Sequence, residues 1–470
     1  MNKITLQKYA LIASDLLAIM ISYFFATEFT NYIKGIPSHQ LNLHHWSWVK
    51  MLDVLLFITF FWQKQLYFKR RPNWEEVRII YKVLLLIALI NIPVLFFRHL
   101  GSSTNVLIFI LFWVLLLIFV PIFRSITKLA LSNMSLWQRN LYIIGVDQNA
   151  ITGYELLTSS NLLGYNVKGF VDLTNKTSRV LIKERSVAVL KVSELLKQDK
   201  HSEILVCLDG QYLASNIKLI NQLQTTFLSV MILPQLEGLP LYGVEINHFF
   251  GNEQLLLRLE SNLSSRFNRL VKQLFDVIVA ILLFAPVLLI GLVLSLLIFM
   301  EDRGNPFFIQ PRIGKNGKIF GCIKFRTMHK NAERMLENWK NRQDPIYLDY
   351  VANNYKLPND PRVTKVGRFL RKSSLDELPQ LINVLLGQMS LVGPRPLLPS
   401  EIDDYLDGEF YYTQVSPGIT GLWRISGRSK TSFVDRARLD SWYIKNWSLW
   451  YDIVILIKTI VVVIRRDGAY

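Results

Sequence analysis

The sequence predicts a membrane protein of the α plus α/β class, and three observations lead to that class. Four apolar runs follow one another within the first 123 residues, an alternating strand and helix pattern occupies residues 139–250, and a further run of 24 apolar residues precedes the C-terminal third. Of the 470 residues 51% are hydrophobic, and 53 Lys and Arg residues outnumber 36 Asp and Glu residues. A chain that is both apolar and basic suits an anionic membrane surface or an anionic substrate.

The N-terminal segment, residues 1–130, is predicted to form a four-helix transmembrane bundle. Each apolar run, the second with its flanks, has close to the roughly 20 residues that a spanning helix needs. The runs are Leu6–Phe29, Met51–Trp62, Ile79–Phe97 and Val106–Phe123. Cations crowd the second connection and the segment after the fourth run: Lys64, Lys69, Arg70, Arg71, Arg78, Arg124, Lys128 and Arg139. Because cytoplasmic loops carry the excess of Lys and Arg, both ends of the bundle are predicted to face the cytosol.

Two carboxylates, Asp15 and Asp53, lie within or near the first two spans. A carboxylate inside a membrane is a functional candidate. A role in pairing helices is the interpretation that we favour.

Residues 139–250 are predicted to form a small parallel α/β domain of Rossmann-like type. Its strands are expected at Leu141–Ile144, Lys168–Val171, Ile204–Leu208 and Ser229–Leu233. A dinucleotide site needs G-x-G-x-x-G, whereas Asp147 here replaces the glycine that lets the backbone approach a pyrophosphate. We therefore interpret the domain as a scaffold for assembly or regulation, with nucleotide binding as the alternative.

The apolar run Val277–Met300 is predicted to enter the membrane and return to the same face, as a re-entrant helix over about residues 273–300. Pro286 lies near its middle, where a proline bends a helix sharply. A straight fifth span is the alternative. It would export a downstream segment that is rich in cations, which the positive-inside rule disfavours.

Two adjacent carboxylates, Asp376 and Glu377, stand in a stretch that is rich in cations. Pro379 is tolerated in the first turn of a helix but not further in, which favours an N-cap at Asp376 over one at Ser374. One interpretation is a cap and a first-turn acid. The other is a nucleophile that forms an acyl phosphate from a phosphoanhydride. Glu377 would then hold a divalent cation, and nearby cations would absorb the charge of the moving phosphoryl group.

Other cations are candidates for binding an anionic substrate. Residues 307–320 are predicted to form two strands joined by a Lys-Asn-Gly turn. Beyond them, alternation puts Lys324 and Arg326 on one face, where they could meet a diphosphate. Exposed strand cations without a ligand are the alternative.

The tail adds a glycine-rich segment and a final apolar helix. The glycines of Ser416–Arg428 allow close backbone approach to a ligand, and Trp423 or Arg428 could stack on or bind a nucleotide. A structural turn is the alternative. The apolar run Ile453–Ile464 contains a lysine and follows several aromatic residues, which predicts an interfacial helix.

Five motifs follow in order: Lys324-Phe-Arg-Thr-Met, Asp360-Pro-Arg-Val-Thr, Ser374-Leu-Asp-Glu-Leu-Pro-Gln, Gly393-Pro-Arg-Pro and Pro417-Gly-Ile-Thr-Gly. With them, residues 266–470 resemble the bacterial sugar transferase family. These are monotopic phosphoglycosyl transferases, which move a sugar-1-phosphate from a nucleotide sugar to a polyprenyl phosphate. The preceding bundle and Rossmann-like domain resemble the large-subfamily architecture. The tail is most similar to undecaprenyl-phosphate galactose phosphotransferases, and glucose-1-phosphate transferases are nearly as similar.

The resemblance implies a role for individual residues. Asp376 would attack the sugar-linked phosphorus of a UDP-sugar and carry a phosphosugar–aspartyl intermediate, while Glu377 would hold Mg²⁺. Arg371 and Arg395 would clamp phosphates. Further substrate-binding candidates are Lys324, Arg326, Arg362 and Arg428. Pro286 would form the break of the re-entrant helix, and Arg424 stands where relatives often carry Gln.

The implied partners are a UDP-sugar, undecaprenyl phosphate and inner-membrane lipid. The implied place is the bacterial cytoplasmic (inner) membrane with the catalytic domain on the cytosolic face, at the start of O-antigen, capsule or exopolysaccharide assembly. The sequence decides neither the sugar nor between a monomer and a homo-oligomer. Nucleic acid is not an expected partner, because no zinc-finger, helix-turn-helix or RNP pattern occurs. Cys207 and Cys322 are far apart, which argues against a disulfide framework and a cysteine zinc site.

Two other classes of function stay open. One is a non-catalytic membrane protein for assembly or regulation, whose basic face binds anionic lipid. The other is a nucleotide-dependent sugar-modifying enzyme seated in the Rossmann-like domain.

Overall fold

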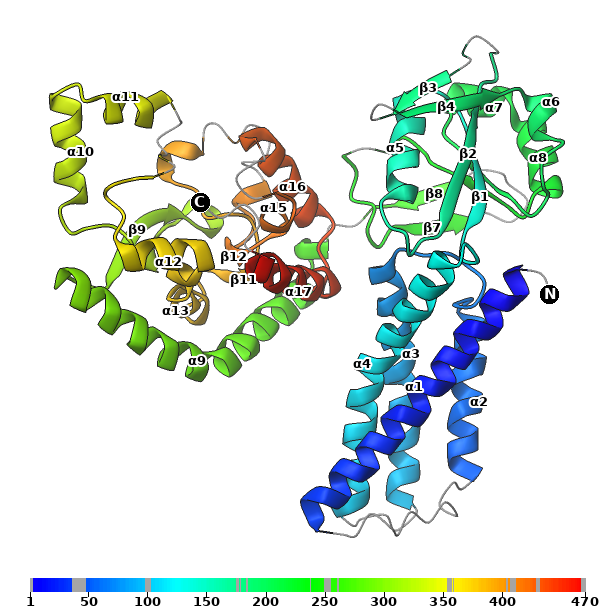
Figure 1. Ribbon diagram of the computed structural model, residues 1–470, viewed down its shortest axis with the longest axis horizontal. Helices are drawn as coiled ribbons and strands as arrows, with labels where there is room; N and C mark the ends of the chain where they lie inside the picture. Colours follow the sequence, from blue (N-terminus) through cyan, green and yellow to red (C-terminus); the bar gives the residue numbers. More distant parts are fainter. Residues whose placement is uncertain are drawn as a thin grey trace. The chain divides into compact units, whose positions relative to one another are not determined.

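The structure is a computed structural model. It describes residues 3–35, 48–97, 103–174, 177, 179–182, 185–236, 238–248, 255–259, 262–352, 357, 359–402, 405, 411–427 and 432–465. The chain divides into two compact units, Met1–Leu236 and Glu237–Tyr470. Figure 1 labels the helices and strands of both units.

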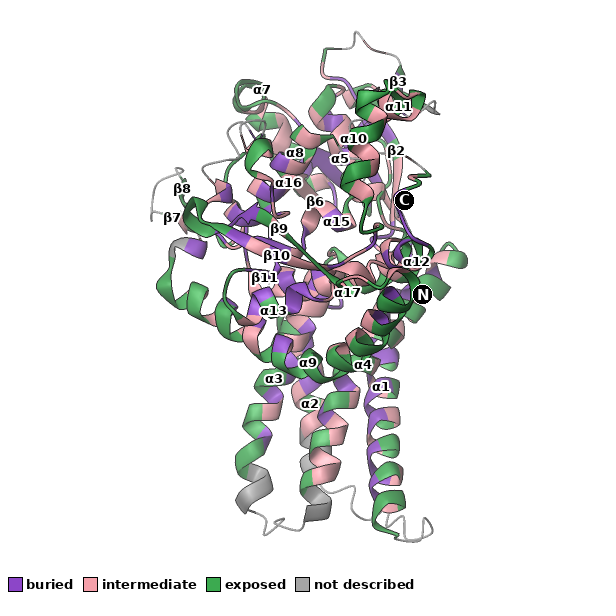
Figure 2. Cartoon of the chain, turned by 90° about the vertical axis from the view of Figure 1, so that its left-hand side faces the viewer, coloured by how far each residue is buried: buried purple, intermediate pink, exposed green. Residues whose placement is uncertain are grey.

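The first unit begins with four helices, α1 (Lys3–Lys34), α2 (Trp48–Gln63), α3 (Asn73–Phe97) and α4 (Ser103–Asn133). They lie side by side, and their buried faces share one apolar core that includes Phe61, Ile87 and Leu116 (Figure 2). Many leucine and isoleucine side chains on their outer faces are exposed. Among the described residues, three helices are long and apolar enough to cross a membrane: Lys3–Lys34, Val106–Asn133 and, in the second unit, α9 (Arg266–Asp302).

The two carboxylates on the apolar helices pair helices, as the sequence favoured. Asp15 of α1 accepts hydrogen bonds from Arg124 of α4 at 2.7 and 2.8 Å and from the Tyr67 hydroxyl at 2.9 Å. On α2, Asp53 accepts from the side-chain amide of Asn91 on α3 at 2.8 Å. A buried carboxylate needs such partners, because an unpaired charge in an apolar core is costly.

The rest of the first unit is an α/β domain. Four predicted strands match β1 (Arg139–Ile144), β2 (Tyr165–Val171), β5 (Glu203–Val206) and β6 (Ser229–Ile232). The sequence interpretation missed an edge hairpin of β3 (Arg179–Ile182) and β4 (Arg185–Leu190). Within the described residues the sheet has the order β3-β4-β2-β1-β5-β6, and its pairs are parallel except β3–β4. The helices are α5 (Gln148–Thr158), α6 (Val192–Leu195), α7 (Gly210–Ser215) and α8 (Ile217–Thr226).

The residue that breaks the dinucleotide fingerprint has a structural role. Asp147 is the N-cap of α5, and its side chain accepts from the Ala150 N–H at 3.1 Å. A cap of this kind satisfies one of the free N–H groups at a helix start. The carboxylate therefore stands at the position that a bound pyrophosphate would need.

The second unit packs short helices and strands against α9. It starts with the hairpin β7 (Glu245–His248) and β8 (Leu255–Arg258) and the turn η2 (Asn262–Ser264). The predicted hairpin is present as β9 (Phe307–Ile313) and β10 (Ile319–Phe325), joined by η3 (Lys315–Gly317), in which Asn316 and Gly317 have φ of 57° and 72°. The elements that follow are α10 (Ala332–Asn341), α11 (Pro345–Ala352), α12 (Lys365–Ser373), η4 (Leu375–Glu377), α13 (Gln380–Leu385), β11 (Ser390–Val392), η5 (Pro399–Glu401), β12 (Gly418–Thr420), α15 (Leu422–Ile425), α16 (Phe433–Lys445) and α17 (Leu449–Arg465).

Helix α9 is tied to the rest of its unit near both ends. Near its start, the Lys272 ammonium donates to the Val392 carbonyl at 3.0 Å and to Asp452 of α17 at 2.9 Å. At its end, the Glu301 carboxylate accepts from the Lys365 N–H at the start of α12, at 2.7 Å. These polar contacts fix both ends of one long helix to the same set of elements.

The middle of α9, in contrast to its ends, is apolar and exposed. Pro286 lies inside the helix, and Leu282, Leu289 and Val293 around it are 59–71% exposed. Figure 1 shows α9 bent, with α12 and α13 on the inner side of the bend. A proline inside a helix removes one hydrogen bond and favours such a bend. The outer side is thus a continuous apolar surface.

We expect Gly367→Ala to destabilise the second unit, because α12 contacts the backbone of the segment after β10 at this glycine. A Cβ atom on Gly367 would lie 2.0 Å from the Thr327 carbonyl oxygen. Overpacking typically costs about 1–3 kcal/mol. The Thr327 backbone can move aside less easily than a flexible side chain could. Thermal unfolding of the purified chain should show a lower midpoint for this unit. Gly210→Ala is the control, since no described atom lies within 4 Å of its Cβ position, and an unchanged midpoint for Gly367→Ala would contradict the expectation.

Candidate active site

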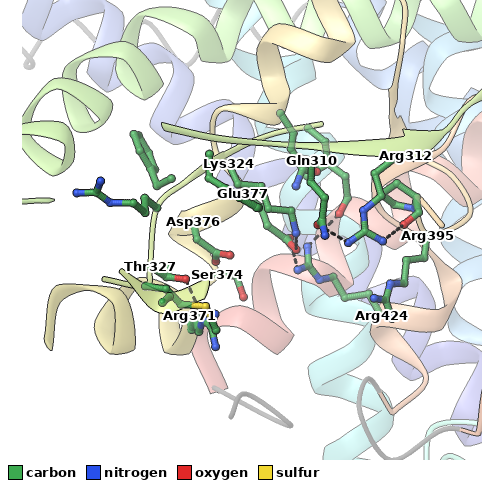
Figure 3. A pocket seen from close by; sticks show the side chains of 18 of the residues that line it. Gln310, Arg312, Lys324, Thr327, Arg371, Ser374, Asp376, Glu377, Arg395 and Arg424 are labelled. Atoms are coloured by element: carbon green, nitrogen blue, oxygen red, sulfur yellow. Dashed lines mark hydrogen bonds and ion pairs between the residues drawn. The ribbon is translucent and has the colours of Figure 1, made fainter. Parts of the chain in front are cut away.

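A cavity of about 790 Å³ opens in the second unit beside the acidic pair (Figure 3). Its walls come from β9, β10 and the segment after it, the start of α10, the end of α12, η4, the start of α13, the loop after β11, the β12–α15 region and α16. Eight of the residues that the sequence singled out line it: Lys324, Arg326, Arg371, Asp376, Glu377, Arg395, Trp423 and Arg424. The fold therefore gathers in one place charges that are scattered along the C-terminal third.

The acidic pair is held differently from the sequence expectation. The N-cap assigned to Asp376 is wrong: α12 ends at Ser373 with Ser374 as its C-cap, at a left-handed φ of 58°, and Asp376 and Glu377 belong to the 3₁₀ turn η4. The next helix starts only at Gln380, with Pro379 as its N-cap. A proline has no N–H to satisfy, so it suits a helix start in either arrangement. The turn, and not a helix mouth, points both carboxylates at the cavity (Figure 3).

The two carboxylates differ in how strongly nearby cations neutralise them. The Glu377 side chain pairs with Arg424, and its other oxygen lies 3.7 Å from the Lys324 ammonium. Burial by itself would raise the pKa of Glu377, but Arg424 and Lys324 outweigh it and hold that pKa below its ordinary value. For Asp376, burial and the charge of Glu377 raise the pKa against the pull of the surrounding cations. Asp376 is thus the more basic and less neutralised of the two acids.

Arginines form the other wall of the cavity. The Arg312 guanidinium donates to the Pro396 carbonyl at 3.0 Å and lies 3.5 Å from Glu401, which also lies 3.9 Å from Arg395. On the Asp376 side, Arg371 donates to the Thr327 hydroxyl at 3.0 Å. Because a guanidinium presents several donors in one plane, such a wall suits phosphate oxygens.

Not every predicted site residue reaches the cavity. Arg362 is not among the described residues that line the cavity. Its guanidinium pairs with Asp360 at 2.7 Å and lies 4.7 Å from the centre of the Tyr350 ring. Arg362 is buried and fastens the segment of α10 and α11. Arg428 lies outside the described residues. Pro286 lies in α9, away from the lining.

Sequence reasoning missed two cavity arginines, Arg312 and Arg436. For Arg312 a signal existed, since Phe308, Gln310 and Arg312 lie two apart on β9 and all line the cavity. Arg436 had no such signal, because it reaches the cavity from helix α16. Trp423 also lines the cavity, and among the described residues its indole N–H is buried without a hydrogen-bond partner.

The glycines of the tail approach protein backbone. A Cβ atom on Gly418 would lie 2.1 Å from the Gly393 nitrogen, and one on Gly421 would lie 2.2 Å from the Gly393 oxygen. The close packing of β11 and β12 thus requires these glycines, which is the structural alternative raised for them from the sequence. Gly418 also lines the cavity.

Glu377 and Asp376 offer the kind of oxygen ligands that Mg²⁺ prefers. No group of three or more His, Cys, Asp or Glu side chains within the described residues could hold a metal ion by itself. Mg²⁺ is commonly bound by one or two carboxylates, with water and substrate phosphates as the other ligands. The donor set fits such a site, but Arg424 and Lys324 already face the two oxygens of Glu377.

Behind the arginine wall, Asp440 of α16 is buried and accepts from the Tyr405 hydroxyl and, at 3.4 Å, from the Arg395 N–H. Burial raises the pKa of Asp440 to about 7, against these hydrogen bonds and the charges of Arg395 and Arg436. In the unfolded chain it ionises near pH 4. Between about pH 4 and 7 the folded state therefore binds the extra proton, and its stability falls as pH rises through that range.

We expect Asp440→Asn to remove this pH dependence, which corresponds to up to about 4 kcal/mol. The unfolding midpoint should fall between about pH 5 and pH 8 in the wild type and fall less in the variant. Asp435→Asn is the control, because that side chain on the same helix is 53% exposed. Equal falls in wild type and Asp440→Asn would contradict the expectation.

A half-buried carboxylate pair in an arginine-lined cavity, in a unit built around a long apolar helix, defines the site of an enzyme for phosphorylated substrates at a membrane. A sequence model described as bacterial sugar transferase matches residues 267–466. The chain is 36% identical to "UDP-galactose-lipid carrier transferase" of Erwinia amylovora over 472 residues, which covers 98% of this chain and 97% of that protein. It is also 36% identical to "Undecaprenyl-phosphate galactose phosphotransferase" of Salmonella typhimurium, over 98% of this chain and 97% of that protein.

A third relative matches a shorter part. "UDP-glucose:undecaprenyl-phosphate glucose-1-phosphate transferase" of Escherichia coli is 36% identical over 264 residues, which is 54% of this chain and 52% of that protein. Because the two longer relatives match along nearly their whole length, the chain belongs to the bacterial sugar transferase family.

Proposed function

We propose that this chain transfers a sugar-1-phosphate from a UDP-sugar to undecaprenyl phosphate and releases UMP. The reaction would be the first membrane step of O-antigen, capsule or exopolysaccharide assembly. Galactose-1-phosphate is the first choice for the group transferred, because the two relatives that match over nearly the whole chain carry galactose in their names. Glucose-1-phosphate is the second choice, from the shorter match.

The observation that carries the proposal is the position of Asp376. It lies in the cavity beside Glu377, within the influence of Lys324, Arg371 and Arg424. Burial raises its pKa, which makes it a stronger base and a better nucleophile than an ordinary surface aspartate once it is ionised. The surrounding cations favour that ionised form and any phosphate that approaches it.

In the proposed reaction, an Asp376 carboxylate oxygen attacks the phosphorus that carries the sugar. The bond from that phosphorus to the bridging oxygen breaks, and UMP leaves with the electron pair. An oxygen of undecaprenyl phosphate then attacks the phosphorus of the aspartyl intermediate, which frees the Asp376 carboxylate. Arg371, on one side, and Arg395, on the other, would hold the phosphate oxygens in line. Mg²⁺, held by Glu377, would neutralise charge on the diphosphate when bound.

We infer that α9 is re-entrant and that the four N-terminal helices span the membrane. Both ends of α9 contact the same unit, and its exposed apolar middle carries Pro286. A straight span would put its ends about 30 Å apart on opposite faces, which these contacts oppose. The acceptor lipid would then reach the cavity from the membrane surface at the cytosolic side, where the cations of the bundle's connections also lie.

Labelling of single cysteines tests this topology. We expect cysteines introduced at Glu333 on α10 and at Gln148 on α5 to react with an impermeant thiol reagent from the cytosolic side of inverted membrane vesicles only. Both native cysteines are buried, and the unmodified chain serves as background. Reaction at position 333 from the outer side would contradict the re-entrant arrangement.

The function is tested by UMP release from a panel of UDP-sugars, with the purified full chain, undecaprenyl phosphate and Mg²⁺. We expect one UDP-hexose to dominate, with release that depends on the lipid acceptor over many turnovers. Release from UDP-glucose instead of UDP-galactose would shift the sugar within the same family. No release from any UDP-sugar would favour a non-catalytic membrane role.

A further inference from the structure

The ion pair between Arg424 and Glu377 is a contact at the site that the proposed reaction leaves unexplained. The two groups lie 47 positions apart in the chain, and the guanidinium donates directly to the Glu377 carboxylate. A second nitrogen of Arg424 donates to the Ile419 carbonyl at 3.0 Å. The Arg424 side chain is 10% exposed. The guanidinium is therefore a fixed part of the cavity wall.

The negative charge of the acidic pair is already more than neutralised without a metal ion. The two carboxylates of Asp376 and Glu377 face the cations of Lys324, Arg371 and Arg424. A divalent ion placed on Glu377 would add two positive charges to a group that carries a small net positive charge. Positive charges that share one carboxylate lie close together and repel each other strongly in a partly buried site. The free ion should therefore bind poorly unless an anion arrives with it.

We propose that Arg424 is a built-in competitor of the divalent cation at Glu377. In the empty cavity the guanidinium takes the position on the carboxylate that the metal needs. When a nucleotide diphosphate enters, its oxygens can take over the guanidinium, since Arg binds phosphate with the same fork of donors. Glu377 is then released for the metal ion. Metal and diphosphate thus bind as a pair, and the cavity does not load with metal alone.

This inference deepens the proposed function and rests on it for the identity of the metal and the diphosphate. It assigns to Arg424 a positioning role, because the residue acts through Glu377. A glutamine at position 424 has no charge, so it would leave Glu377 with Lys324 alone at 3.7 Å. The metal site would then be open before any nucleotide arrives.

The test measures Mn²⁺ binding to the purified full chain by the loss of the free-ion electron paramagnetic resonance signal, without turnover. In the absence of nucleotide, Arg424→Gln should bind Mn²⁺ at least about tenfold more tightly than the wild type. Adding UDP should tighten Mn²⁺ binding strongly in the wild type and only slightly in the variant, since linkage between two ligands is reciprocal. Arg438→Gln, at an exposed arginine of α16, is the matched control and should behave as the wild type.

Two further variants make each outcome decisive. Glu377→Gln introduced into Arg424→Gln should abolish the gain, and a gain that persists would place the metal elsewhere and overturn the proposal. If Arg424→Gln does not fold, Arg424→Lys replaces it. A lysine ammonium cannot donate to both the Ile419 carbonyl and the Glu377 carboxylate as the guanidinium does, so Mn²⁺ binding should still tighten. Unchanged Mn²⁺ affinity in a folded variant overturns the proposal. Mn²⁺ binding is measured without catalysis. A failure of UMP release would therefore contradict the proposed function, whereas the Mn²⁺ affinities would still test the role of Arg424.

Discussion

Asp376→Asn is expected to abolish sugar-phosphate transfer while the chain still folds and inserts into the membrane. Asparagine has nearly the same shape, but its neutral amide cannot form an acyl phosphate with the donor. Loss of a catalytic nucleophile typically lowers turnover by about 10⁴-fold or more. Glu377 cannot take over, because its charge is engaged by Arg424 and Lys324 and its pKa is held low. UMP release and transfer of labelled sugar phosphate measure the effect.

A labelling experiment separates a covalent role from a role in binding. Wild-type protein incubated with a UDP-sugar labelled in the sugar, without lipid acceptor, should retain the label on the chain, and Asp376→Asn should not. Asp435→Asn is the matched control, since that aspartate is exposed on α16. The thermal midpoint of Asp376→Asn should not fall, because burial disfavours the charge that the change removes. Turnover near the wild-type level in this variant would refute the nucleophile assignment.

Arg124→Leu should destabilise the N-terminal helices by about 3–5 kcal/mol, the usual cost of breaking a buried ion pair on one side. Arg124 is 1% exposed, and its guanidinium joins Asp15 of α1 and Glu76 of α3. Without it, Glu76 still pairs with Lys128, whereas Asp15 keeps the Tyr67 hydroxyl but has no cation to pair with among the described residues. Expression in membranes and thermal unfolding in detergent should both show the loss.

The comparison variant for Arg124 is Arg78→Leu in the same unit. Arg78 lies 3.4 Å from Glu75 one helical turn away, and both side chains are partly exposed. Such a pair contributes about 1 kcal/mol or less. Combining Asp15→Asn with Arg124→Leu should restore part of the lost stability, because one of the stranded charges disappears. Equal midpoints for Arg124→Leu and Arg78→Leu would show that the buried network does not hold the helices together.

The α/β domain and the cavity illustrate how far sequence patterns reach. The central strands were predicted, because buried strands between helices leave continuous apolar runs such as Leu141–Ile144. The edge strands β3 and β4 were missed, since their exposed and buried residues alternate over only a few positions. In the second unit, the Lys-Asn-Gly turn was predicted from local backbone preference. The N-cap at Asp376 was predicted by the same kind of reasoning, and it was wrong because α12 ends in a left-handed Ser374 that starts a separate turn.

By itself, the sequence determined the apolar segments, the order of the motifs and the two acids on which the proposed chemistry depends. Each of these is written in neighbouring residues, where periodicity and composition can be read directly. The tertiary structure alone decided which charge meets which. It brings Arg124 to Asp15, 109 positions apart, and Arg424 to Glu377, 47 positions apart. The physical reason is that an ion pair depends on the distance between side chains in space, which the chain sets only when residues far apart in sequence pack together.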